Sequence, residues 1–194
     1  ITIEVLDAFG VEVDRRQEGF SVAGGQEYET SDSEYVVPGD FSSASYLLAA
    51  GAIAGDGVRV EGLYPGPQGD KAIVSILDRM GAAIEWRREE GVVLVEESDL
   101  SGVEVDVGDT PDLLPTVAVL GAVASGTTTI TNCEHVRYKE TDRVAAMAEA
   151  LKRLGAAVTE EQDTLTIHGD ASDLEGTRLE IGRASCRDRV YCEV

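Results

Sequence analysis

The sequence of 194 residues is poor in lysine, cysteine and tryptophan, and it has no long apolar run. Lys71, Lys139 and Lys152 are the only lysines among 16 basic residues, and 37 Asp and Glu bring the net charge to −21. No segment approaches the ~20 apolar residues of a membrane-spanning helix, and three cysteines are too few for a disulfide scaffold. The negative charge disfavours nucleic acid and anionic membranes, because both would repel the chain. Small molecules are therefore the expected partners.

The preference for acidic residues and for arginine is typical of cytoplasmic proteins in high salt, where ions screen the repulsion between carboxylates. An ordinary acidic surface would give a similar composition. Outside the last 13 residues Cys133 is the only cysteine, which indicates a reducing, cytoplasmic location and no disulfide. The chain opens in the middle of a predicted element, which suggests a fragment. Residues 182–194 hold three Arg and two Cys, so we expect a non-native tail.

A repeat predicts the architecture. Three segments share the pattern Leu-x-x-x-Gly followed by small and β-branched residues, and they end on Gly10, Gly81 and Gly155. Apolar residues at helical spacing precede each glycine, so each is predicted to end a helix in the left-handed conformation. Two strands are expected after each glycine, at 11–14 and 20–23, at 83–86 and 92–95, and at 156–159 and 164–168.

A second kind of helix recurs at an offset of about 70 residues. It is predicted at 43–54 and 114–124, and strands follow it at 58–61 and 127–131. The repeating unit is thus strand, helix, strand, helix, strand, strand, and the chain holds two copies and the end of a third. This pattern predicts a mixed α/β fold. The Pro-Gly pair within 36–40 is the best candidate for a hinge.

A charged segment precedes a helix predicted to begin near Thr141. Thr141 and Asp142 are explained as a helix cap and a partner of the helix dipole. Lys139, Glu140 and Arg143 place a carboxylate between two cations, an arrangement that suits an anionic ligand and proton transfer. A solvated charged turn would have the same sequence features.

Another carboxylate, Asp112, lies just before the helix predicted at 114–124. Either Asp112 or Asp109 would also serve as a simple helix cap, and Asp40 is expected to cap the preceding helix in the same way. The acidic residues between 104 and 112 lack the spacing of a calcium loop, so we predict no metal. Dinucleotide-binding and nucleotide-binding glycine motifs are also missing from the sequence.

Three ordered motifs resemble the 5-enolpyruvylshikimate-3-phosphate (EPSP) synthase family. They are PGDFSSASYLLAA at 38–50, TPDLLPT at 110–116 and RYKETDR at 137–143, and the resemblance runs from Ile1 to about Glu180. The Lys-Glu-Thr-Asp-Arg element is specific to this family within its superfamily. The resemblance implies two domains, each with three of the repeated units, in the inside-out α/β barrel of enolpyruvyl transferases, which would be incomplete here.

The resemblance also implies where the domains meet. Residues 1–37 would close the first domain, 38–40 would be the hinge, and 40–181 would supply two of the three units of the second domain. A vacancy would remain in the second domain. We expect the helix and hairpin of 1–29 to fill it, either within the chain or by exchange in a segment-exchanged homo-oligomer.

Members of this family transfer the enolpyruvyl group of phosphoenolpyruvate to the 5-hydroxyl of shikimate 3-phosphate, in aromatic amino-acid biosynthesis, without cofactor or metal. By position, Asp112 would accept the hydroxyl proton and Glu140 would exchange a proton with the methylene carbon. Lys139 would contact shikimate 3-phosphate and Arg143 would contact phosphoenolpyruvate. His135 occupies a substrate-contact position where many members carry Asn, and both side chains can donate a hydrogen bond.

Several substrate contacts of the family fall outside this sequence, so we expect the isolated chain to be inactive. Two related enzymes are alternatives. UDP-N-acetylglucosamine enolpyruvyl transferase shares the fold but is disfavoured by residues 139–143. RNA 3'-terminal-phosphate cyclase is disfavoured by the charge and by the lack of its His-containing signature. A non-catalytic ligand-binding or interaction domain of the same fold is the alternative outside enzymes.

Overall fold

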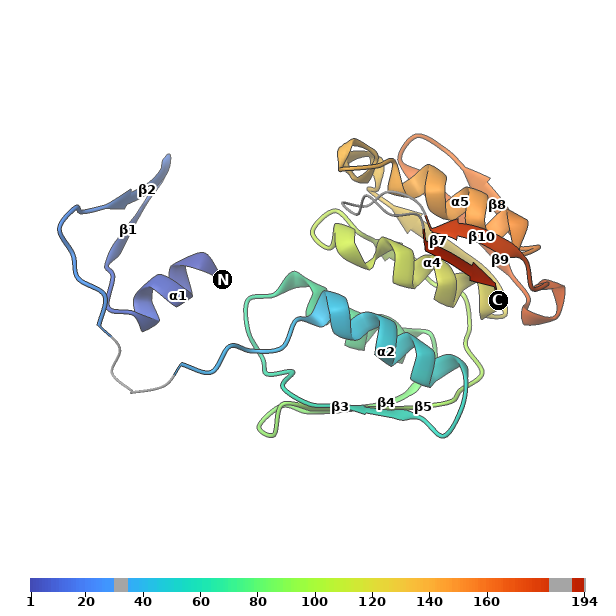
Figure 1. The fold of residues 1–194 in the computed structure, drawn as a ribbon, viewed down its shortest axis with the longest axis horizontal. Coiled ribbons are helices and arrows are strands. Elements are labelled where there is room, and N and C mark those ends of the chain that lie inside the picture. The colour runs from blue at the N-terminus through green and yellow to red at the C-terminus, as the bar shows by residue number, and fades with distance from the viewer. Residues whose placement is uncertain (30–34, 182–189, 194) are drawn as a thin grey trace.

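The computed structural model describes residues 1–29, 35–181 and 190–193. A small N-terminal unit consists of helix α1 (Thr2–Ala8) and the antiparallel hairpin of β1 (Val13–Arg16) and β2 (Gly19–Val22). Figure 1 shows this unit beside a larger body that begins with helix α2. The larger body carries most of the helices and strands, and it holds every residue of the candidate site.

The first half of the body is a three-stranded antiparallel sheet with two helices. Its elements are α2 (Phe41–Ile53), β3 (Val58–Val60), the 3-10 turn η1 (Gly69–Lys71), α3 (Ala72–Arg79), β4 (Ala83–Arg87) and β5 (Val92–Glu96). The strand order is β3-β5-β4, so the hairpin partner β5 is the central strand.

The second half repeats this plan around a four-stranded sheet of order β6-β7-β9-β8. Its elements are β6 (Glu104–Asp106), η2 (Pro111–Leu113), α4 (Leu114–Val123), β7 (Gly126–Thr131), η3 (Glu134–Tyr138), α5 (Arg143–Arg153), β8 (Ala157–Glu160) and β9 (Thr164–Gly169). A short turn η4 (Ala171–Asp173) and the antiparallel pair β10 (Arg178–Ile181) and β11 (Val190–Glu193) follow. Strand β6 runs parallel to β7, and the other pairs in this sheet are antiparallel.

The predicted repeat is confirmed. Gly10, Gly81 and Gly155 follow α1, α3 and α5 with φ of +74°, +93° and +100°, the left-handed values that glycine tolerates without a Cβ clash. The two halves differ at their beginning, because residues 35–40 form no strand whereas β6 opens the second half. The fold is mixed α/β with repeated units, and the described part of the chain forms no closed barrel.

Helices α2 and α4 form the centre of the core. They touch through a buried hydrogen bond of 2.8 Å between Ser45 Oγ and Thr116 Oγ1, so the polar atoms at this contact are satisfied. Gly121 lets α4 approach β7 closely, since a Cβ there would lie 2.8 Å from the Cβ of Thr128. Leu48 and Leu120 are fully buried beside these contacts. The two helices are therefore fixed against their sheets and against each other.

Part of this helix pair remains uncovered. Tyr46, Leu47 and Val119 on α2 and α4 are exposed large apolar side chains. Figure 1 shows α1, β1 and β2 apart from these helices, so the intramolecular docking that we expected for 1–29 does not occur in this structure.

Two further predictions concern the surface and the end of the chain. Within the described residues, no helix combines the length and the apolar character needed to cross a bilayer. Of the predicted non-native tail, 182–189 and 194 lie outside the described residues, whereas 190–193 form β11 beside β10.

Candidate functional site

Acidic residues at the starts of the body helices gather on one side of the molecule. Figure 1 shows that α2 and α4 begin at the same end of the body. Asp40 caps α2 by accepting hydrogen bonds from the backbone N–H groups of Ser42 and Ser43. Burial raises the pKa of Asp70 in η1, and the negative charges of Asp112 and Asp40 raise it further. The helix starts thus bring together carboxylates from separate parts of the sequence.

Asp112 lies at the centre of this group and binds two cations. Its Oδ1 accepts hydrogen bonds from Lys139 Nζ at 2.7 Å and from Arg143 Nη1 at 2.6 Å. Arg143 also donates from Nε to Glu140 Oε1 at 3.1 Å. The side chains of Lys139 and Arg143 are 26% and 24% exposed, so the cations are partly shielded from water. We call Asp112, Lys139, Glu140 and Arg143 the four-residue cluster.

The cations stabilise both carboxylates in their charged forms. The hydrogen bond from Lys139 is the main cause that lowers the pKa of Asp112; burial opposes it, and Arg143 adds to the lowering. The hydrogen bond from Arg143 lowers the pKa of Glu140 in the same way. Both carboxylates are therefore ionised at neutral pH, and their negative charges balance the positive charges of Lys139 and Arg143.

The structure shows which side chains cap the helices and which form ion pairs. Asp112 makes no side-chain cap hydrogen bond, so its interpretation as a helix cap is wrong. Thr141 is not the cap of α5 either, because Asp142 is the N-cap residue and accepts from Ala145 N at 2.9 Å. Lys139 and Arg143 form ion pairs with Asp112, and Arg143 also pairs with Glu140, so the charged side chains of this turn are held together.

Arg137 fixes the loop that carries the cluster, a role that the sequence analysis missed. Its guanidinium donates to Glu160 Oε1 at 2.7 Å, to Asp142 Oδ2 at 3.0 Å, and to the carbonyl oxygens of Gln162 and Glu161 at 2.9 and 2.6 Å. The side chain is only 12% exposed. No spacing rule could find the contacts with Glu160, Glu161 and Gln162, because these residues of β8 and the following turn are more than 20 residues away from Arg137. An arginine inside a charged motif was the only signal.

Asp70 was also missed, although a signal was available. The repeat places an Asp at the start of α2 and of η2, and Asp70 occupies the same place before α3. Gln68 lies next to it and bridges the start of α2, since its Oε1 accepts from Phe41 N at 2.9 Å and its Nε2 donates to Gly39 O at 2.8 Å. The turn before α3 therefore helps to position the residues around Asp40.

His135 does not join the four-residue cluster. It is exposed on η3 and lines a separate cavity of about 320 Å³ with Asn132 and Tyr138. Asn132 has a φ of +55°, in the left-handed region that Asn adopts more readily than most residues with a side chain, and its Nδ2 donates to Asp106 Oδ2 at 2.5 Å. His135 is therefore open to a ligand, and within the described residues its side chain makes no hydrogen bond or ion pair with the four-residue cluster.

The cluster has the groups for acid–base chemistry on an anionic ligand. Two cations can hold phosphate or carboxylate groups, and two carboxylates can accept or donate protons. Within the described residues, no group of three or more His, Cys, Asp or Glu side chains is arranged to hold a metal ion.

Comparisons with known proteins agree on one family. The profile of the family EPSP synthase (3-phosphoshikimate 1-carboxyvinyltransferase) matches residues 1–183. Proteins named 3-phosphoshikimate 1-carboxyvinyltransferase from Halorubrum lacusprofundi and Halobacterium salinarum are each 60% identical to the chain over 96% of its length. The chain spans 44% of the length of each of these relatives.

Solved structures of an EPSP synthase and of another enolpyruvyl transferase also match this chain. An EPSP synthase from Acinetobacter baumannii matches with a TM-score of 0.70 and 29% identity, over 84% of this chain and 39% of that one. The enolpyruvyl transferase NikO from Streptomyces tendae has a TM-score of 0.58 at 21% identity, over 86% of this chain and 39% of that one, which shows a shared fold. The family profile, the close relatives and the arrangement of repeated units lead to one conclusion: the chain belongs to the EPSP synthase family.

Proposed function

We propose that the four-residue cluster is one wall of an active site that transfers the enolpyruvyl group of phosphoenolpyruvate to the 5-hydroxyl of shikimate 3-phosphate. The carboxylate of Asp112 between Lys139 and Arg143 is the observation that carries this proposal. Both substrates are anions, and these cations are held where an anion would compete with Asp112 for them. The family membership supports the same reaction.

In this proposal, substrate binding changes the basicity of Asp112. The hydrogen bond from Lys139 is the main cause of its low pKa in the unliganded chain. A substrate phosphate that takes over Lys139 and Arg143 removes this stabilisation and raises the pKa of Asp112. The carboxylate therefore becomes a stronger base at the time when the hydroxyl of shikimate 3-phosphate is bound. It then accepts the hydroxyl proton while the oxygen bonds to the enol carbon.

Glu140 has the complementary role. Arg143 lowers its pKa in the unliganded chain, and the loss of Arg143 to the carboxylate of phosphoenolpyruvate makes Glu140 easier to protonate. It gives a proton to the methylene carbon during addition and takes one back from the resulting methyl group as phosphate leaves. We assign His135 to a substrate contact, because it lines an open cavity on the same loop.

We further propose that this wall is incomplete. The side chain of Asp112 is 45% exposed, so water competes at the centre of the cluster and a bound anion is held weakly. Residues 1–37 are proposed to close a first domain, 38–40 to be the hinge, and 40–181 to supply two units of the second domain. The chain alone is expected to bind shikimate 3-phosphate without turnover.

The working environment proposed for the protein is a cytoplasm of high salt. Its net charge of −21 supports this, as do the 60% identical relatives from Halorubrum and Halobacterium. The buried free thiol of Cys133 is compatible with a reducing compartment. The cluster contacts are short and partly buried, so they persist in salt that screens the surface charges.

A thermal shift assay in high salt tests the proposal. Shikimate 3-phosphate is expected to raise the melting temperature, because a ligand that binds only the folded chain stabilises it. Lys139→Gln should abolish the rise, and Lys152→Gln, the same change on exposed α5 surface, should keep it. Shikimate and UDP-N-acetylglucosamine should give smaller rises. No rise with shikimate 3-phosphate, or an equal rise in Lys139→Gln, would contradict the proposed site.

A further inference from the structure

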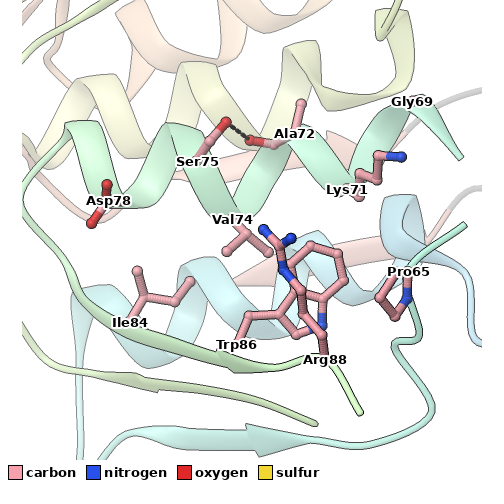
Figure 2. Close-up of a pocket in the computed structure, with 10 residues that line it drawn as sticks. All are labelled: Pro65, Gly69, Lys71, Ala72, Val74, Ser75, Asp78, Ile84, Trp86 and Arg88. Carbon is pink, nitrogen blue, oxygen red and sulfur yellow. Dashed lines mark hydrogen bonds between the residues drawn. The ribbon is translucent and has the colours of Figure 1, made fainter. Parts of the chain in front are cut away.

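A second cavity lies between α3 and β4, and the four-residue cluster has no part in it. Its volume is about 500 Å³, within the range of small-molecule sites. Figure 2 shows its residues: α3 and the turn before it form one wall, and β4 and the turn after it form the other. Nothing in the proposed reaction uses this cavity.

The floor of the cavity is apolar and rigid. Val74, Ile84 and Trp86 supply it, and the indole of Trp86 is held on two sides. Its Nε1–H donates to the carbonyl oxygen of Leu63 at 2.8 Å, and its ring packs edge-on against Phe41 with 5.4 Å between centroids. Because the only polar atom of the indole is already satisfied, the side chain offers a fixed apolar surface to a ligand.

Two cations lie beside this apolar floor. The guanidinium of Arg88 lies 4.8 Å from the centre of the Trp86 rings, and Lys71 approaches from the α3 wall. Lys71 donates to the carbonyl oxygen of Gly66, and its other ammonium hydrogens remain available. Figure 2 shows Lys71 and Asp78 at opposite ends of the cavity, with the guanidinium of Arg88 between them beside Val74.

Within the described residues no carboxylate pairs with Arg88, and what distinguishes it is its place over the ring of Trp86 at the cavity. Arg87 next to it pairs with Glu85, and Arg59 pairs with Glu61. Stacking on Trp86 orients the planar guanidinium and leaves its N–H groups for an external acceptor.

We propose that this cavity binds a small aromatic carboxylate. The ring packs on Val74, Ile84 and the indole edge of Trp86, and the carboxylate is bound by Arg88 through two parallel N–H···O hydrogen bonds. Lys71 adds a second positive charge on the α3 side of the cavity. Asp78, opposite Lys71, repels a second negative group, which favours ligands with a single anionic group.

The net charge of the protein sets the conditions under which binding is observed. A charge of −21 repels anions over long distances at low ionic strength. At about 1 M salt the Debye length is only ~3 Å, so this repulsion is screened while the direct contact with Arg88 persists in part. Binding of the aromatic anion is therefore expected to strengthen between low and high salt, opposite to an ordinary surface ion pair.

Nuclear magnetic resonance of the single tryptophan tests this proposal in the full chain. Trp86 is the only tryptophan, so its indole N–H gives one resonance that reports on the cavity. Benzoate is the probe, benzamide is a neutral aromatic control of the same shape, and acetate is an anion without a ring. Arg88→Gln is the test variant. Arg87→Gln is the matched control, since it makes the same change at the neighbouring residue, which pairs with Glu85 instead.

Benzoate is expected to shift the indole resonance in a saturable manner, and Arg88→Gln should weaken its affinity about tenfold or more, as the loss of a charge-assisted pair does. Arg87→Gln should bind like the unchanged chain. Affinities are taken from the concentration dependence, because Arg88→Gln also changes the starting position of the resonance. An absent shift, an equal response to benzamide, or unchanged affinity in Arg88→Gln would each overturn the proposal. Circular dichroism verifies that each variant is folded.

Discussion

Replacement of Arg137 by alanine should destabilise the chain and release the loop that carries the four-residue cluster. Arg137 makes hydrogen bonds to two carboxylates and two backbone carbonyls, and its side chain is 12% exposed. A hydrogen bond to a charged group contributes about 1.5–3 kcal/mol. The carboxylates of Asp142 and Glu160 are 41% and 30% exposed and recover water in the variant, so the four contacts do not add. We expect a net loss of about 2 kcal/mol.

That loss corresponds to a fall of roughly 4–8 °C in melting temperature for a chain of this size. Calorimetry measures it, and hydrogen exchange should accelerate at residues 134–143. Arg59→Ala is the matched control, because the pair of Arg59 with Glu61 is 46% and 69% exposed and should change stability by less than about 1 kcal/mol. The Arg137→Ala effect should also survive in 1 M salt, since a partly buried pair is screened less than an exposed one.

Equal losses in Arg137→Ala and Arg59→Ala would refute this reasoning, and so would an Arg137→Ala effect that disappears in high salt. Arg137→Lys offers an intermediate case. Lysine keeps the charge but lacks the planar fork that reaches four acceptors, so it should recover only part of the lost stability.

Three further predictions concern the cluster, the core and the start of α2. The pKa of Asp112 is lower in the folded chain than in the unfolded chain, so its contribution to stability is present above the unfolded pKa of about 4 and is lost as the pH falls through the folded value. In Asp112→Asn the free energy of unfolding should therefore fall less steeply with pH in this acid range. Thr116→Val should cost about 0.5–1.5 kcal/mol in denaturant unfolding, because it removes one of the two hydrogen bonds of Ser45 Oγ and leaves the one to Ser42 O; a cost near zero would argue against the Ser45–Thr116 bond. Gly39→Ala should cost about 1–3 kcal/mol, since its Cβ would lie 2.9 Å from the carbonyl oxygen of Gly62. No change in the same assay would show that the backbone moves enough to relieve this contact.

Local patterns predicted much of the fold. Helices at 43–54 and 114–124 were expected, and α2 and α4 occupy Phe41–Ile53 and Leu114–Val123. The three glycines that end helices were also found, because a left-handed residue after an apolar helical pattern is a local signal. Strand β6 was not located, since a three-residue edge strand lacks a pattern of its own and depends on β7 for its hydrogen bonds.

The candidate site was predicted in its residues but not in its contacts. Lys139, Glu140 and Arg143 lie within five residues, so their charge pattern is visible in the sequence. The partner Asp112 is 27 residues before Lys139, and the repeat alone suggested that both lie at helix starts. Whether Asp112 caps its own helix or binds cations from another loop depends on how η2 and η3 meet in space.

The sequence by itself determined the repeated α/β unit, the acidic surface and the family, because helix periodicity, glycine caps and charged motifs are local properties of the chain. Only the tertiary structure decided that Lys139 and Arg143 bind Asp112, that Arg137 joins the loop to β8, and that Arg88 stacks on Trp86 without a carboxylate. Each of these contacts joins side chains from different elements or orients them against a cavity. Their geometry depends on the packing of helices and sheets, which sequence spacing does not encode.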